Sequence, residues 1–540
     1  MPMLQKPIDT ETGAAADEGR RPAVVAAPVH FAILSHYRHC FLALALTLGS
    51  YPCDAESAGE WTGVIPLPII PVAAALLPDG RVLGWSSSAM FAFAGDIGDT
   101  SSQTYTSLTT PQNLKSTLKI VTNTGADMFC PGTAYLPNGQ LLVNGGDSSP
   151  KTSIYDPPTR TWFSDAEMNV PRGYNADVLL STGSVLTLGG SWTGDAHEDK
   201  IGEVWTPGQG WSRRSGISAQ PITGPDPQDV NFIYRGDNHA WLFAVKDGRV
   251  FHAGPSAKMH WITTDGDGTI VTAGNRGNDP YSMNGKAVLY DIGKIFKTGG
   301  APAYQDAYAT TNTYIIDIND AIADPQNPVV VTNTAPMQYP RAFANAVVLP
   351  TGQIVVVGGQ TYAAPFSDDN AVLIPELWDP ASMSFTPLAP MQTPRVYHSV
   401  ALLLPDGRIF VGGGGQCGTC ATNHPDAEIF SPPYLFNSDG TPATRPAITS
   451  APSAGTLGQT IDVTTSVAVE NFAIMRLSSS THSVDNDQRR VPLTIQSSPT
   501  ALYYVLSIPA DAGSVPLGYY MLFAMDAQGV PSQAWMILME

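Results

Sequence analysis

Residues of unusual chemistry occupy matching places in a repeated sequence pattern. Counting back nine or ten residues from the glycine of each of several turns leads to Cys130, Tyr174, Phe343, the pair Tyr397–His398 and the pair Asn238–His239. A thiol, two phenols and an imidazole at equivalent positions can gather around one point and bind a metal ion. Phenol oxygen and imidazole nitrogen suit Cu(II) or Fe(III) better than zinc.

This residue set also suggests redox chemistry. A phenol has a pKa near ~10, so a bound cation is needed to keep it as phenolate at neutral pH. The oxidation of an alcohol removes two electrons, whereas copper accepts only one. Gly-Gly pairs end several apolar runs, for example at 145–146 and 189–190. No helix is expected after them, so they do not form a dinucleotide-binding site. A second redox group must therefore come from the protein, and Tyr174 next to the sulfur of Cys130 is a candidate.

A packing role is the alternative for the same positions. Aromatic residues at a repeated position commonly fill the core between repeats, and a buried cysteine is commonly an inert small hydrophobe. Phe343 occupies one of these positions and offers packing alone. The residues by themselves leave both interpretations open.

The turns belong to an internal repeat that occurs seven times. Each copy has an apolar run, a turn ending in glycine and a second apolar run, which predicts a hairpin with glycine at positive φ. A spacing of roughly 45–65 residues is typical of kelch-type blades of four strands, so residues 59–445 are predicted to form a seven-bladed all-β propeller. The copies are 73–83, 133–146, 177–190, 241–251, 293–300, 346–359 and 401–415.

The repeat stops after Pro446, and residues 446–540 have a different pattern. Short alternating runs such as Thr460–Thr465 and Ala501–Ile508 are separated by Gly, Pro and Ser turns. This pattern predicts a carboxy-terminal β-sandwich of the immunoglobulin class.

Residues 1–58 are predicted to be a disordered leader. Their apolar run, Phe41–Leu48, has the size of a signal-peptide core and is too short to span a bilayer. We expect secretion, with an uncleaved amino-terminal anchor as the alternative. Cys417 and Cys420 stand in a Cys-Gly-Thr-Cys run, which could be a local disulfide, half of a metal site or a redox motif. No second pair of matching spacing and no βαβ pattern accompanies it, so we expect a local disulfide, which favours an oxidising compartment.

The net charge argues against one class of partner. The chain carries a formal charge of −19 that is spread along its length, and such a surface repels phosphate backbones. We expect no nucleic-acid partner and no membrane span.

Six ordered segments together resemble the galactose oxidase family of copper-radical oxidases. The resemblance runs from about Trp61 to the end of the chain. The segments are 127–132, 172–174, 188–192, 234–241, 395–398 and 481–490.

The resemblance implies a redox centre with one copper ion. Tyr174, Tyr397, His398 and His482 would bind the metal, and Tyr397 would take the proton of the alcohol. Cys130 would form a thioether with Tyr174, which would hold the radical, and Trp192 would stack over that bond. His482 lies in the carboxy-terminal unit, so its loop would have to reach into the propeller axis.

The resemblance also implies a substrate. Arg235 and Gln305 would bind sugar hydroxyls, and an aromatic wall would surround them, formed by Phe93, Phe343, Phe366, Tyr304 and Trp192. A monomer that oxidises the C6 primary alcohol of galactose or galactosides, including oligosaccharides, is therefore expected, with O2 reduced to H2O2. The family's amino-terminal carbohydrate-binding domain has no counterpart in residues 1–58, so the resemblance does not extend to tethering on polymeric substrates.

Three alternatives remain at this stage. Two are oxidases with the same centre, one acting on aryl or aliphatic alcohols and one resembling glyoxal oxidase. The third is a kelch binding module without catalysis, which would have no use for the cysteine, tyrosine and histidine set.

Overall fold

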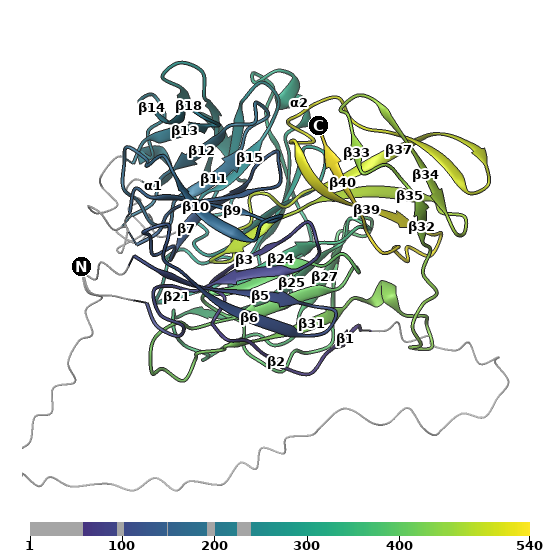
Figure 1. Cartoon of the computed structure of the whole chain (residues 1–540), viewed down its shortest axis with the longest axis horizontal. Coiled ribbons are helices and arrows are strands. Elements are labelled where there is room, and N and C mark those ends of the chain that lie inside the picture. The colour runs from purple at the N-terminus through teal and green to yellow at the C-terminus, as the bar shows by residue number, and fades with distance from the viewer. Residues whose placement is uncertain (1–57, 94–101, 148, 192–199, 224–238) are drawn as a thin grey trace, which may run out of the picture.

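The computed structural model describes residues 58–93, 102–147, 149–191, 200–223 and 239–540, and these are almost entirely β-structure (Figure 1). Seven antiparallel sheets of four main strands succeed one another along the chain. The first strands of neighbouring sheets lie against each other around a common axis, for example β7 with β11 and β24 with β29. The predicted seven-bladed propeller is confirmed.

The first four blades each take four consecutive strands. Blade 1 contains β3 (Ala73–Leu76), β4 (Val82–Trp85), β5 (Thr104–Thr110) and β6 (Lys115–Val121). Blade 2 contains β7 (Pro131–Tyr135), β8 (Leu141–Gly145), β9 (Thr152–Asp156) and β10 (Thr161–Asp165). Blade 3 contains β11 (Ala176–Leu179), β12 (Val185–Leu188), β13 (Gly202–Thr206) and β14 (Gly210–Arg214). Blade 4 contains β15 (Trp241–Ala244), β16 (Val250–Gly254), β17 (Lys258–Thr263) and β18 (Thr269–Asn275).

Short extra strands accompany the last three blades. A strand that precedes blade 1 in the sequence completes blade 7. Blade 5 contains β19 (Lys286–Asp291), β20 (Lys294–Thr298), β22 (Thr313–Asp317) and β23 (Val330–Asn333). Blade 6 contains β24 (Ala342–Val348), β25 (Ile354–Gln360), β27 (Glu376–Asp379) and β28 (Ser384–Pro387). Blade 7 contains β29 (Ser399–Leu403), β30 (Ile409–Gly413), β31 (Asp426–Ser431) and β1 (Glu60–Trp61), with β2 (Ile65–Pro66) also on β31. A separate ribbon pairs β21 (Ala307–Tyr308) with β26 (Tyr362–Ala363).

The repeat in the sequence corresponds to the two inner strands of each blade. In blade 3, β11 and β12 are buried along their whole length, whereas the outer strand β14 is largely exposed. Strands packed on both faces are continuously apolar, which makes the inner hairpins visible in the sequence. Their turn glycines have positive φ as predicted, for example +84° at both Gly139 and Gly183.

The ring of blades is closed by pairing the two ends of the propeller. Strand β1 adds to β31 in antiparallel register, with Trp61 opposite Phe430. Their rings lie 4.8 Å apart, so apolar packing supports the closure. The helices in the described residues are short: α1 (Gln220–Thr223), α2 (Asn319–Ala323) and a 3-10 turn at Pro433–Leu435. None of the helices in the described ranges has the length and apolar character needed to cross a membrane.

After β31 the chain forms a second, curled β-unit on one side of the propeller (Figure 1). The shared strand β37 belongs to both halves of its eight-stranded sheet, and apolar side chains of the two halves form one core. The expected sandwich is thus one sheet folded on itself. Its strands are β32 (Ile448–Ser450), β33 (Ala454–Gly455), β34 (Thr460–Thr465), β35 (Asn471–Arg476), β37 (Arg490–Thr500), β38 (Tyr503–Ser507), β39 (Gly518–Met525) and β40 (Trp535–Met539).

One segment of the carboxy-terminal unit enters the propeller. Strand β36 (Ser479–Thr481) pairs with β3 of blade 1, with Thr481 opposite Ala73. The loop that follows is buried, and its side chains bind backbone groups of other blades. Asp487 accepts from the Tyr135 amide (2.9 Å), Asn486 accepts from the Leu242 amide (3.2 Å) and Gln488 accepts from the Val348 amide (2.6 Å). We name residues 479–490 the axial segment.

Candidate functional site

The residues aligned by the repeat stand where the chain enters the first strand of each blade. Cys130, Tyr174 and His398 lie just before β7, β11 and β29, and Phe343 is the second residue of β24. All four adopt left-handed backbone, with φ between 58° and 66°. Such a conformation costs about 1–3 kcal/mol in a residue other than glycine, so surrounding contacts must hold it.

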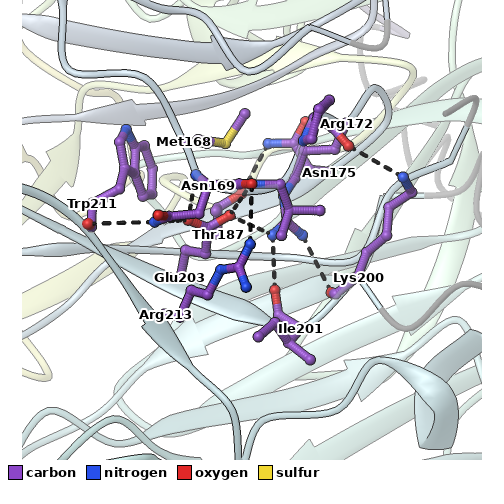
Figure 2. Close-up of polar contacts among 12 residues, drawn as sticks. Met168, Asn169, Arg172, Asn175, Thr187, Lys200, Ile201, Glu203, Trp211 and Arg213 are labelled. Carbon is purple, nitrogen blue, oxygen red and sulfur yellow. Dashed lines mark hydrogen bonds and ion pairs between the residues drawn. The ribbon is translucent and has the colours of Figure 1, made fainter.

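Buried ion pairs supply such contacts, and Figure 2 shows the one in blade 3. The guanidinium of Arg172 contacts Glu203 at 2.9 Å and donates to the carbonyls of Gly189 (2.9 Å) and Ile201 (2.8 Å). Glu203 also accepts from the amides of Asn169 (2.8 Å) and Val170. Tyr174 follows Arg172 by two residues, so this cluster fixes the backbone that carries it.

Blades 6 and 7 repeat the arrangement. Arg341 contacts Glu376 at 2.8 Å, and Arg395 contacts Glu428 at 3.4 Å. Each glutamate also accepts from backbone amides of the Met-x-x-Pro-Arg turn, such as the amide of Gln338 (2.6 Å) for Glu376. These glutamates were not among the residues expected from the sequence. Their signal is a glutamate two residues before Trp or Phe on the third strand: Glu203, Glu376 and Glu428.

His482 reaches the same place from the carboxy-terminal unit. It follows β36 in the axial segment, with φ of 48°. Thr481 donates to the carbonyl of Val72 (3.3 Å), and Ser483 donates to the carbonyl of Phe343 (3.0 Å). Hydrogen bonds to two blades therefore hold His482 between them.

Five side chains meet at the propeller axis: those of Cys130, Tyr174, Tyr397, His398 and His482. The Tyr174 and Tyr397 hydroxyl oxygens lie 2.7 Å apart, and Cys130 Sγ lies 3.2 Å from His482 Nε2. The sulfur of Cys130 and one nitrogen from each of His398 and His482 lie within 4.8 Å of one another. The structure thus brings together the four expected metal ligands and Cys130.

The two imidazoles are oriented and kept neutral. His398 Nδ1 donates to the carbonyl of Gly415 at 2.6 Å, which leaves its buried Nε2 as an acceptor with no partner among the described residues. Burial lowers the pKa of His398 to about 3. Burial, followed by the neighbouring His398 and His239, lowers the pKa of His482 well below its usual value. The Nδ1 atom of His482 lies 2.8 Å from the hydroxyl oxygen of Thr481. Neutral imidazole whose far nitrogen is held by a hydrogen bond is the form that binds metals.

Cys130 and Tyr174 are close in the fold as well as in the repeat. The Tyr174 amide donates to the Cys130 carbonyl at 2.7 Å, and both side chains belong to one buried cluster with Phe129. Cys130 is fully buried. It lies outside the disulfide that joins Cys417 and Cys420.

An aromatic wall stands beside the centre. Phe93 stacks on Phe129 (5.3 Å between ring centroids) and on Phe366 (5.8 Å). Phe366 lies edge-on to Tyr397 at 5.0 Å. Sequence analysis missed Phe129, because it precedes the aligned position in blade 2 by one residue.

Of the other residues expected to bind substrate, Phe343 and Tyr304 lie beside Tyr397. Phe343 lies 5.3 Å from the ring of Tyr397, and the Tyr304 hydroxyl donates to the Tyr397 hydroxyl at 2.6 Å. Gln305 is partly exposed and donates to Asp306 at 3.1 Å. Trp192 and Arg235 lie outside the described residues.

His239 is a further residue at the centre that received no role from the sequence. Its ring lies 5.2 Å from that of His482 and 5.7 Å from that of Tyr174. Its Nδ1 bonds to the carbonyl of Asn175 at 2.7 Å, and burial lowers its pKa to about 4. Its place nine residues before Gly248 was the available signal.

Known proteins share this architecture. The family model "Galactose oxidase-like, Early set domain" matches residues 445–539, and the model "Glyoxal oxidase N-terminus" matches residues 293–434. The galactose oxidase of Gibberella zeae is 43% identical over 494 residues, which cover 90% of this chain and 71% of that protein. The aldehyde oxidase GLOX of Vitis pseudoreticulata is 28% identical over 453 residues, covering 77% of this chain and 82% of that protein.

A solved structure is similar over most of the chain. It is titled "Novel fungal alcohol oxidase with catalytic diversity among the AA5 family, in complex with copper". The two structures have a TM-score of 0.83 at 39% sequence identity, and the match covers 89% of this chain and 100% of the other.

Proposed function

The chain belongs to the galactose oxidase family of copper-radical oxidases, and we propose that it oxidises the C6 primary alcohol of galactose and galactosides to the aldehyde. The alcohol loses two protons and two electrons, and O2 takes them up to form H2O2. One observation carries the proposal: two neutral imidazoles, two phenols and a thiol converge at the propeller axis.

We propose that one copper ion binds at this point. Tyr174, Tyr397, His398 and His482 would hold it, and the buried Nε2 of His398, which has no partner in the described part of the chain, supports that assignment. Two imidazole nitrogens and two phenol oxygens form a donor set suited to copper. Bound copper would stabilise phenolate and accept one of the two electrons.

The second electron requires a group of the protein. We propose that Cys130 Sγ bonds to the ring of Tyr174 and that the modified tyrosine holds the radical. The S–H bond and one ring C–H bond break as the C–S bond forms, and O2 accepts the two protons and two electrons to form H2O2. The burial of Cys130 and its backbone hydrogen bond with Tyr174 support this pairing.

The two tyrosines would divide the work on the alcohol. Tyr397 as phenolate takes the hydroxyl proton, and the oxygen of Tyr174 takes the hydrogen from the carbon. Their hydroxyl oxygens are 2.7 Å apart, so one primary alcohol group can reach both. Trp192 is proposed to shield the radical.

We propose that two sides of the site, one polar and one aromatic, select the substrate. Arg235 and Gln305 would bind the ring hydroxyls of the sugar, and Phe93, Phe343, Phe366 and Tyr304 would face its apolar surface. An aryl or aliphatic alcohol is the second candidate substrate, because Phe93, Phe129 and Phe366 form a continuous stack.

We also propose that the enzyme is secreted and acts as a monomer. The Cys417–Cys420 disulfide supports secretion, because disulfides persist in oxidising compartments.

A substrate screen tests the function. Copper-loaded protein is assayed for peroxide release with galactose, benzyl alcohol and methylglyoxal, and Tyr397→Phe serves as the matched inactive control. Preferred turnover of galactose is expected. Preference for benzyl alcohol would support the second candidate, and peroxide release from none of the three would refute the proposal.

A further inference from the structure

A short loop closed by the Cys417–Cys420 disulfide contacts both the candidate metal centre and the segments that carry the aromatic wall. We name residues 415–424 the disulfide loop. Asn423 organises it: its side-chain oxygen accepts from the amides of Gln416 (2.8 Å) and Cys417 (3.0 Å), and its Nδ2 donates to the carbonyl of Gly418 (2.6 Å). These bonds and the disulfide give the loop one defined shape.

The disulfide loop holds two of the proposed copper ligands. The carbonyl of Gly415 accepts from His398 Nδ1 at 2.6 Å, and the amide of Gly415 donates to the carbonyl of Tyr397 at 3.0 Å. Gly415 has a φ of +89°, and a Cβ there would lie 2.2 Å from the carbonyl oxygen of Thr422. Only glycine fits this position without displacing the loop.

The same loop holds the segment that carries Phe93. The buried Gln416 donates through Nε2 to the carbonyls of Ala92 (2.7 Å) and Ala89 (3.1 Å). The amide of Gly418 donates to the carbonyl of Phe91 at 2.9 Å. Phe93 follows Ala92 directly, so the disulfide loop fixes the backbone that carries the Phe93 ring.

The disulfide loop also contacts the segment that carries Phe366. His424 Nε2 lies 3.0 Å from a carboxylate oxygen of Asp368, two residues after Phe366. The rings of Phe93 and Phe366 stack at 5.8 Å, and Phe366 lies edge-on to His398 at 5.6 Å. One loop therefore contacts both halves of the wall and two proposed ligands.

We propose that the disulfide loop determines which alcohols enter, with Gln416 as the positioning residue for the Phe93 side of the wall. A disulfide that only stabilised its own turn would not need hydrogen bonds to both wall segments. Because the loop also anchors His398 and Tyr397, it sets the distance between the reacting centre and the wall. The inference rests on the proposed function, since it names what selects the substrate of that same site.

The test compares two glutamine variants. Gln416→Met removes the donors to Ala89 and Ala92 while keeping chain length. Gln140→Met is the matched control, because the Gln140 amide donates to Asp156 (3.0 Å) at a blade turn of the propeller. The assay measures kcat/KM for benzyl alcohol and for the wider 2-naphthalenemethanol. Hydrogen exchange of residues 86–93 is measured on copper-free protein.

Gln416→Met is expected to lower the ratio of kcat/KM for benzyl alcohol to kcat/KM for 2-naphthalenemethanol by about tenfold. This is the discrimination between substrates of a well-fitted apolar pocket. Residues 86–93 should exchange about tenfold faster in the same variant, and Gln140→Met should match wild type in both measurements. A Cys417→Ser/Cys420→Ser variant should move both measurements in the same direction and also speed exchange of residues 362–371.

Two results would overturn the inference. One is exchange in Gln416→Met equal to that of Gln140→Met, and the other is faster exchange with an unchanged ratio. If wild type oxidised neither alcohol nor galactose, the proposed function would fail, while the exchange measurement would still decide whether the loop holds the wall.

Discussion

The buried pair of Arg172 and Glu203 gives a prediction that can be worked out from the structure. Glu203→Ala leaves the guanidinium of Arg172 buried without its carboxylate, since both side chains are 0% exposed. It also removes the acceptor for the amides of Asn169 and Val170. Breaking a buried pair by removing one partner costs about 3–5 kcal/mol, and we expect a loss of this size in the free energy of unfolding.

Urea denaturation of copper-free protein measures the loss, with Glu167→Ala as control. Glu167 pairs with Lys151 at the surface, where the two side chains are 52% and 40% exposed. Such a pair contributes about 0–1 kcal/mol, so the control should remain close to wild type. Glu203→Gln, which keeps an acceptor for the amides, should fall between the two. Equal losses for Glu203→Ala and Glu167→Ala would refute the argument that the buried pair holds the Tyr174 backbone.

Three further predictions follow from the site and the axial segment. Arg235→Ala should weaken galactose use by roughly 1.5–3 kcal/mol in kcat/KM, the range for a hydrogen bond to a charged group, and benzyl alcohol use by less; equal losses would make Arg235 structural. His482→Ala should keep the fold but abolish most of the rise in melting temperature on copper addition, because that rise comes from binding to the native state; an unchanged rise would exclude His482 as a ligand. Burial raises the pKa of Asp177 from 3.8 to about 7, so the native state retains a proton that the unfolded chain releases between these values. The free energy of unfolding should therefore fall as pH rises from about 4 to about 7, and Asp177→Asn should reduce that fall when both proteins are unfolded in urea at about pH 4 and about pH 8.

Much of the propeller was predictable because its inner strands are buried on both faces. The continuous apolar runs of β11 and β12 made the repeat visible, and counting from Gly183 led to Tyr174. Outer strands such as β6 have mostly exposed side chains and share no pattern between blades. The sequence therefore predicted the number of blades but not the bounds of their outer strands.

The residues of the candidate site were likewise predictable only in part. Cys130, Tyr174 and His398 share a place in the repeat, so their convergence follows from blade equivalence. His482 has no such place, and only the resemblance of residues 481–490 indicated it before β36 was seen to pair with β3. The contacts of Gln416 were not predictable, because they join segments far apart in the chain through a loop that no repeat describes.

The thioether between Cys130 and Tyr174 is the central claim, because copper, oxygen and the convergence of two blades must all be as proposed for it to form. The most direct test is the intact mass of purified copper-free protein before and after copper is added in air, with peptide fragmentation to locate the change. The account predicts that the mass falls by the two hydrogens lost on bond formation, that a cross-linked peptide pair contains Cys130 and Tyr174, and that Cys130→Ser shows neither. An enzyme that turns over alcohol while its mass is unchanged and Cys130 remains a free thiol would contradict it.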